Sequence, residues 1–217
     1  MRKPAAMTSE SGRGCLCLAL LFACSGLCGC AIAVESRPPA EAPGAPYREA
    51  GNFVIAAELT RAGFQVAVVD LVSVKGEFRN VAGQLVLGDE GMPRQVEITL
   101  ESASADAGTD WLNDLLRGPK FFNAANHPTV TFKSSAFRQE NQRLAAVDGS
   151  LTVLGVTRSA TLKVARFDCR RQAEGVQCAS QASTTIKRSE FGMTAWSDSV
   201  GDDVTIDISF TALQRKE

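Results

Sequence analysis

Apolar and polar residues alternate along most of the chain after residue 52. Successive side chains of a strand point to opposite faces, so each alternating run predicts a strand with one apolar face. Turn residues separate the runs at regular intervals, which predicts an antiparallel sheet of roughly eight to ten strands, closed as a barrel or folded as a sandwich. The clearest runs are 64–68, 74–78, 85–87, 96–100, 130–132, 147–153, 160–164 and 204–210.

Within 111–134, residues 111–117 depart from this alternation and predict a short amphipathic helix, before the chain returns to a strand at 129–133. Thr109 or Asp110 is suited to cap its first turn, and Gly118 with Pro119 ends it. The expected polar face is Asn113, Asp114 and Arg117. The expected apolar stripe is Trp111, Leu112, Leu115 and Leu116. A lone amphipathic helix in an all-β chain has to cover an apolar surface, such as the mouth of a barrel.

The first thirty residues have the pattern of an export signal. Basic residues precede an apolar run at 15–23, which is too short to span a membrane comfortably. Two processing routes fit the residues that follow. Ala31 and Ala33 suit ordinary cleavage before Val34, whereas 27–30 resembles a bacterial lipobox in which Cys30 would carry lipid. We therefore expect a signal peptide over 1–30, and both routes remain open.

The residues after the signal segment are rich in proline and lack any hydrophobic period, which predicts a flexible linker over 31–50. The folded domain is expected over 51–217. Removal of the signal segment leaves two cysteines, Cys169 and Cys178, on either side of a hairpin tip expected at Glu174 and Gly175. An even pair in an exported protein predicts a disulfide.

Composition and charge exclude several functions. The 217-residue chain has a formal net charge of −1 and no concentrated basic segment, so nucleic-acid binding is not expected. His127 is its only histidine and precedes a proline in a turn. No nucleophile and base pair, and no metal-ligand spacing, can be assembled from the sequence, so we expect neither an enzyme nor a metal site.

Four segments together resemble the YceI-like family of lipid- and polyisoprenoid-binding proteins. They are VKGEFRNVAGQLVL at 74–87, FFNAANHPTVTFKS at 121–134, GSLTVLGVTRSATLKV at 149–164 and TIKRSEFGMTAWSDSVGDDVTIDISF at 185–210. The resemblance covers about residues 53–213. It implies an all-β fold: an antiparallel, lipocalin-like β-barrel of about eight strands with one short helix.

The resemblance also implies a function. Members are exported by bacteria, hold a long isoprenoid tail, as of a quinone or polyprenol, and are often dimers. We therefore expect a periplasmic protein, or an outer-membrane lipoprotein facing the periplasm whose only membrane attachment is its lipid anchor. The expected partners are an isoprenoid lipid and a second copy of the chain. No resident cofactor is expected beyond a bound polyisoprenoid or isoprenoid quinone.

The sequence departs from the family pattern in two places. Where the family carries an Asp and then a His-Ser or His-Thr pair, this chain has Ala56 and Leu59-Thr60. His127 replaces a tyrosine. These changes leave the apolar positions intact, so tail binding is expected to persist while head-group preference is open.

The leading functional hypothesis is a non-catalytic carrier, store or sequestering protein. Its alternative is a periplasmic interaction or stress module that supports a membrane redox system without a bound lipid. If the apolar strand positions face a lumen, the expected lining is Phe64, Val66, Phe78, Ile98, Phe132, Phe191 and Ile206. The residues expected to close its mouth are Leu112, Leu115, Leu116 and Phe122.

Overall fold

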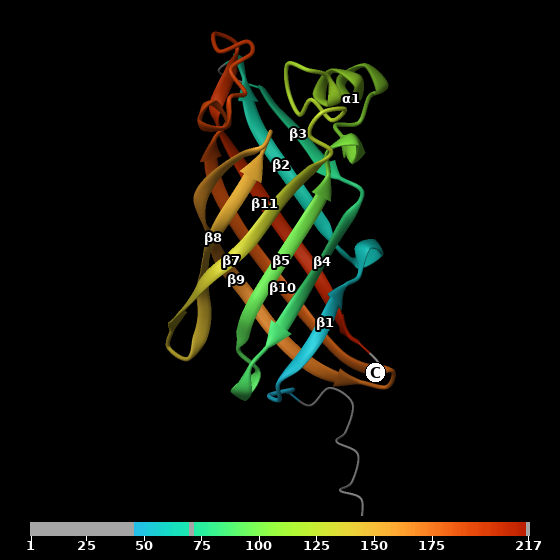
Figure 1. Ribbon diagram of the computed structural model, residues 1–217, viewed down its shortest axis with the longest axis vertical. Coiled ribbons are helices and arrows are strands. Elements are labelled where there is room, and N and C mark those ends of the chain that lie inside the picture. The colour runs from blue at the N-terminus through green and yellow to red at the C-terminus, as the bar shows by residue number, and fades with distance from the viewer. Residues whose placement is uncertain (1–45, 70–71, 216–217) are drawn as a thin grey trace, which may run out of the picture. The chain divides into compact units, whose positions relative to one another are not determined.

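A computed structural model describes residues 46–69 and 72–215, which all belong to one compact unit, Ala40–Glu217 (Figure 1). The expected signal peptide, Cys30 and linker residues 31–45 lie outside the described residues. None of the described helices is long and apolar enough to cross a membrane.

Eleven strands make up the sheet in the described part of the chain. They are β1 (Gly51–Ile55), β2 (Arg61–Val68), β3 (Val72–Phe78), β4 (Val81–Leu87), β5 (Pro93–Glu101), β6 (Ala105–Asp106), β7 (Thr129–Glu140), β8 (Arg143–Val153), β9 (Val156–Gln172), β10 (Gly175–Lys187) and β11 (Val200–Gln214). The helix α1 spans Asp110–Arg117, and a 3₁₀ turn, η5, spans Arg188–Phe191.

The sheet closes into an antiparallel barrel of eight walls. Three walls are interrupted strands: β1 with β2, β3 with β4, and β5 with β6. Each wall pairs with the next along the chain, and β11 returns to pair with both β1 and β2. This up-and-down closure confirms the expected barrel and removes the open edges that a sandwich would leave.

The strand alternation places the apolar residues inside, as expected. Every second residue of β5 is buried, from Val96 through Ile98 to Leu100, and these positions face the interior with those of the neighbouring walls. The inward residues of the whole barrel, from Phe53 to Ala212, form one hydrophobic cluster.

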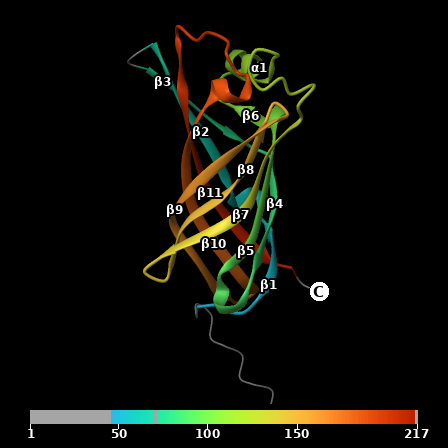
Figure 2. The same cartoon turned by 60° about the vertical axis from the view of Figure 1, so that its left-hand side comes forward.

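The two ends of the barrel differ. We call the end that carries α1, η5, the end of β2 and the start of β3 the mouth end, and the opposite end, which carries the β9–β10 turn, the base end (Figures 1 and 2). The disulfide between Cys169 and Cys178 is confirmed, and it joins directly paired residues of β9 and β10 near the base end. Tyr47 is buried there beside Phe53.

The helix forms where expected, but its inward face is different from the prediction. Thr109 caps it, since its Oγ1 accepts a hydrogen bond from the Leu112 backbone N–H. Trp111, expected in the apolar stripe, is 71% exposed, whereas Asn113, expected on the polar face, is only 8% exposed. The reason is helical geometry: positions 112, 113 and 116 share one face, so Asn113 turns inward with Leu116 and Trp111 turns outward.

Candidate ligand-binding cavity

The mouth half of the barrel encloses a cavity. The centre of a water molecule can reach about 110 Å³ of it, so it is narrow. The inward side chains of β2, β7, β8, β10 and β11 form its walls, and α1, η5 and the segment after α1 close it from above. Apart from Thr184 and Arg188, the side chains that line it are apolar.

The strand register builds the wall in rows. Ile186, Val204 and Val66 are directly paired neighbours on β10, β11 and β2, and all three line the cavity. These three valine and isoleucine side chains are only half-buried. An inward apolar residue that stays accessible shows that the core is not completely filled at this level, in contrast to the fully buried Leu85 and Leu87 in the base half.

Aromatic rings close the cavity beneath α1. Phe122, from the segment after the helix, lies 5.9 Å from the ring of Phe64 and 5.2 Å from that of Phe78, centroid to centroid. Phe121 also lines the cavity, and its ring lies edge-on to Trp196, 5.5 Å away. The segment after α1 and the loop after η5 therefore meet over the cavity through the Phe121–Trp196 contact.

A buried arginine holds the other segment, which is η5 with the loop that follows it, over the cavity. Arg188, 4% exposed, donates from its guanidinium to four backbone carbonyls. Their oxygens belong to Met193, Ala195, Val200 and Gly201, at 2.8–2.9 Å. The arginine thus ties η5 to the loop that leads into β11 and presents an aliphatic stem to the cavity.

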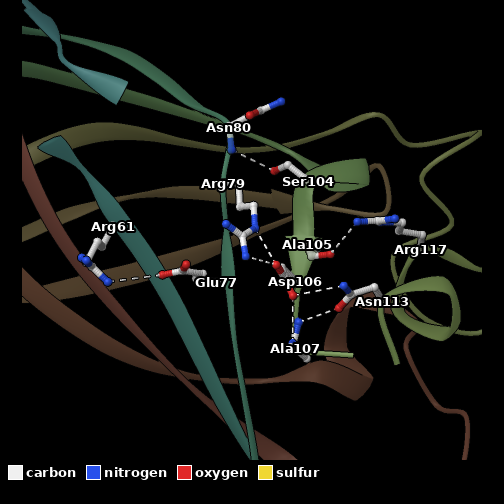
Figure 3. Close-up of polar contacts among 11 residues, drawn as sticks. Arg61, Glu77, Arg79, Asn80, Ser104, Ala105, Asp106, Ala107, Asn113 and Arg117 are labelled. Carbon is white, nitrogen blue, oxygen red and sulfur yellow. Dashed lines mark hydrogen bonds and ion pairs between the residues drawn. The ribbon is translucent and has the colours of Figure 1, made fainter. Parts of the chain in front are cut away.

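A polar cluster around Asp106 fixes α1 on the barrel (Figure 3). Asp106 Oδ1 accepts from the backbone N–H of Gly108 at 2.8 Å and from Asn113 Nδ2 at 3.0 Å, and its other oxygen pairs with Arg79. Asn113 Oδ1 in turn accepts from Ala107 N at 2.7 Å. These bonds connect the turn after β3 with β6 and α1, and they explain why an asparagine occupies the inward face of the helix.

The same contacts shift the acidity of Asp106. The hydrogen bond from the Gly108 backbone, followed by those from Arg79 and Asn113, lowers the pKa of the Asp106 carboxyl to about 2. Each of these donors favours the charged carboxylate. The Asp106 carboxyl is therefore ionised at neutral pH.

Nine of the eleven residues predicted from the sequence line the cavity. The exceptions are Leu112 and Leu115, which pack against the core beside the cavity without lining it. The helix contributes Leu116 alone, which is the one buried residue of the predicted stripe. The nine are Phe64, Val66, Phe78, Ile98, Leu116, Phe122, Phe132, Phe191 and Ile206.

Sequence reasoning missed other lining residues. Leu100, Val130 and Leu162 follow the same alternation as the predicted ones, so the periodic pattern was a sufficient signal for them. Arg188 and Met193 were not predictable in this way, because they lie in η5 and the loop after it, where no period applies. The departures Ala56, Leu59 and His127 lie outside the cavity lining.

The described residues hold no group of three or more His, Cys, Asp or Glu side chains placed to bind a metal ion. What they form is a closed antiparallel barrel with a narrow apolar cavity at one end, which is the architecture of a small binding protein. A model of the YceI-like domain matches residues 53–212. The chain belongs to the YceI-like domain family.

Related proteins agree with this assignment. A UPF0312 protein of Azotobacter vinelandii is 28% identical over 156 residues, which cover 69% of this chain and 80% of the relative. Protein YceI of Salmonella arizonae is also 28% identical, over 144 residues, which cover 65% of this chain and 74% of that protein.

Solved structures show the same fold. Burkholderia cenocepacia BcnA superposes with a TM-score of 0.60 at 24% identity, covering 72% of this chain and 98% of that one. A polyisoprenoid binding domain from Saccharophagus degradans, implicated in plant cell wall breakdown, superposes with a TM-score of 0.57 at 14% identity. It covers 75% of this chain and 98% of its own. At these identities the likeness concerns the fold alone.

Proposed function

We propose that this chain binds the apolar tail of an isoprenoid lipid, such as a quinone or polyprenol, inside the cavity. It acts without catalysis as a carrier, store or sequestering protein. The observation that carries the proposal is the incompletely filled, almost wholly apolar cavity beneath a cover of separate segments. A narrow cavity with such a lining suits an unbranched or methyl-branched chain better than a bulky fused-ring ligand.

The energetics of this site follow from its lining. Burial of apolar surface contributes about 25 cal/mol per Å², or about 0.8 kcal/mol per CH₂ group. Affinity should therefore rise with the number of isoprene units until the cavity is filled. The head group should contribute less, because the guanidinium of Arg188 is already bonded to backbone carbonyls and Ala56 and Leu59 do not line the cavity.

The first test is mass spectrometry of an organic extract from the native, purified protein. An isoprenoid lipid at near-stoichiometric amount is the expected result. A second test titrates the purified protein with prenyl quinones of increasing tail length in detergent-free buffer. An affinity that does not respond to tail length would contradict binding in this cavity.

Paired variants localise the ligand. Val204→Lys places a charge at a half-buried, inward position of β11 that lines the cavity. Ser209→Lys places the same charge on the same strand at an exposed position. We expect the first variant to lose binding and the second to keep it, with circular dichroism and thermal unfolding showing that both remain folded.

Export is the second part of the proposal. The sequence of residues 1–30 supports removal of a signal segment, and the proline-rich residues after it suit a tether. Intact-mass analysis of the protein from native membrane and periplasmic fractions separates the two processing routes. A lipid-modified N-terminus at Cys30 identifies an anchored lipoprotein, whereas an unmodified N-terminus at Val34 identifies a protein released into the periplasm.

The alternative hypothesis has its own outcome in these tests. An interaction or stress module would yield an extract without isoprenoid lipid and would show no response to prenyl quinones. Light scattering coupled to gel filtration tests the predicted homodimer separately.

A further inference from the structure

Both tryptophans of the chain, Trp111 and Trp196, lie at the mouth end, and both are exposed. Trp111 projects from the outer face of α1 with 71% of its surface accessible, and Trp196 lies in the loop after η5 at 44%. Val69 and Val72, at the ends of β2 and β3, are 67% and 63% exposed at the same end (Figures 1 and 2). None of these four residues lines the cavity.

This arrangement is unusual for a soluble surface, because large aromatic side chains are normally buried at least in part. Neither tryptophan is needed to fill the core: Phe121, not Trp196, closes the cavity, and Leu116, not Trp111, carries the helix contact. The two indoles come from separate elements, on the two segments that cover the cavity.

We propose that the mouth end docks on the surface of a lipid bilayer, with Trp111 and Trp196 inserted at the level of the head groups. Indole rings favour this level because they have an apolar body and one N–H donor. Lys120 supports the same orientation, since its Nζ lies 5.8 Å from the centroid of the Trp196 ring, where it would meet lipid phosphates. This docking extends the proposed function, since a protein that takes its ligand from a membrane must approach one.

The contact between Trp196 and Phe121 links the proposed membrane-docking surface to the cavity. Phe121 separates the Trp196 ring from the cavity, and the two rings hold together the two segments of the cover. A bilayer that binds Trp196 would therefore act directly on the contact between Trp196 and Phe121. The lipid tail would then enter at the bilayer surface without crossing water.

The charged residues around the two tryptophans indicate whether docking should require anionic lipid. Exposed Asp110, Asp114 and Asp198 accompany the basic Lys120 and Arg117 around the two tryptophans, so these five residues together carry no net positive charge. Docking should depend on the aromatic side chains and not on anionic lipid. We therefore expect vesicles of phosphatidylcholine to suffice, with little gain when phosphatidylglycerol is added.

The test uses the exported Cys30→Ala protein whose intact mass shows an N-terminus at Val34, so that neither a lipid anchor nor the apolar signal segment contributes. Because both tryptophans lie at the mouth end, their fluorescence reports docking at that end alone. On addition of phosphatidylcholine vesicles we expect a blue shift, and on substitution with brominated phosphatidylcholine we expect quenching. Trp111→Ala and Trp196→Ala, made singly, assign the signal to each indole. The double variant should lose about tenfold in vesicle partition measured by flotation.

The matched control removes exposed apolar side chains from the other half of the barrel. Val54 and Leu213 are paired residues of β1 and β11, 42% and 43% exposed, so Val54→Ala with Leu213→Ala removes comparable accessible side chains. This control should float as the parent protein does. Emission that neither shifts nor is quenched, or equal flotation of the tryptophan double variant and the parent, would overturn docking. A shift produced by a periplasmic protein fraction but not by vesicles would also overturn it, in favour of a protein partner.

Prenyl-quinone binding measured without vesicles keeps this proposal separate from the proposed function. Ligand binding without quenching by brominated lipid would refute docking and leave the carrier function intact. Quenching without ligand binding would refute the carrier function and leave docking intact.

Discussion

The ring of Phe64 occupies the space that a side chain at Gly76 would need. The two residues are directly paired on β2 and β3. A Cβ built at Gly76 would lie 2.9 Å or less from two Phe64 ring atoms and from the carbonyl oxygen of Asp106. The missing side chain thus leaves room for the Phe64 ring, which lies edge-on to Phe122.

Gly76→Val should therefore force Phe64 from its position. We expect unfolding to become easier by about 1–3 kcal/mol, as for other overpacked cores, and isoprenoid affinity to change because Phe64 lines the cavity. Chemical denaturation measures the first effect and ligand titration the second. Gly63→Ala is the control, since its Cβ would find only ordinary contacts at 3.7 and 3.8 Å. Equal stability of the two variants would show that the wall yields easily at Gly76.

Asp106 predicts how the mouth end responds to acid. Its folded-state pKa of about 2 lies below the ordinary carboxyl value of about 3.9, so the carboxylate stabilises the fold above pH 4. This contribution should be lost as the pH falls from about 4 to 2. We expect Asp106→Asn to melt at a lower temperature than the parent at pH 7, with the difference shrinking towards pH 2.

The control for this experiment is Asp114→Asn, on the exposed side of α1. The Asp114 side chain is 82% exposed and lies 4.0 Å from Arg117, so its removal should change the melting temperature little at any pH. A melting difference between Asp106→Asn and the parent that stayed constant from pH 7 to pH 2 would contradict the assigned role of the carboxylate.

The disulfide predicts a stability effect without a binding effect. Cys169 and Cys178 enclose a short hairpin near the base end, whereas the cavity lies in the mouth half. Removing the bridge should cost about 2–3 kcal/mol on the chain-entropy account. Thermal unfolding of Cys169→Ala with Cys178→Ala measures this cost, and prenyl-quinone affinity should remain that of the parent. A large loss of affinity in a folded double variant would mean that the two ends of the barrel are coupled.

The alternating pattern was sufficient to predict the barrel and most of the cavity lining, because the inward residues of most strands are large and apolar. It failed for β10, whose inward positions include Ser180, Ala182 and Thr184. Small and weakly polar residues do not produce a clear alternation of apolar and polar positions, so the sequence of this strand did not predict it. Thr184 also lines the cavity, where a bulkier side chain would fill it.

The cover was the less predictable part. A helical stripe was expected from four apolar residues, but the side that packs is decided by the hydrogen bonds of Asn113 to Ala107 and Asp106. A pattern of apolar residues gives no information about such polar partners. The loop after η5 is likewise held by a charged residue, Arg188, in a stretch whose basic and acidic letters suggest a solvated strand end.

Arg188 gives the last prediction. Its side chain connects η5 to the loop before β11 through four charge-assisted hydrogen bonds to backbone carbonyls. Without the guanidinium, these carbonyls would lose that donor. Arg188→Met keeps an aliphatic stem in the cavity but supplies no donor. We expect a loss of about 2–4 kcal/mol, because buried carbonyls without partners are costly, and faster proteolysis within residues 192–199.

Ligand release should accelerate in the same variant, since Phe191 and Met193 are positioned by this turn and line the cavity. Stopped-flow displacement of a bound prenyl quinone measures the release rate. Lys187→Met is the matched control: Lys187 is the preceding residue, its side chain is 55% exposed, and it pairs with Asp203 at 3.0 Å on the surface. If Arg188→Met were less stable yet released ligand at the parental rate, η5 and its loop would be a structural brace and the ligand would leave through the segment after α1.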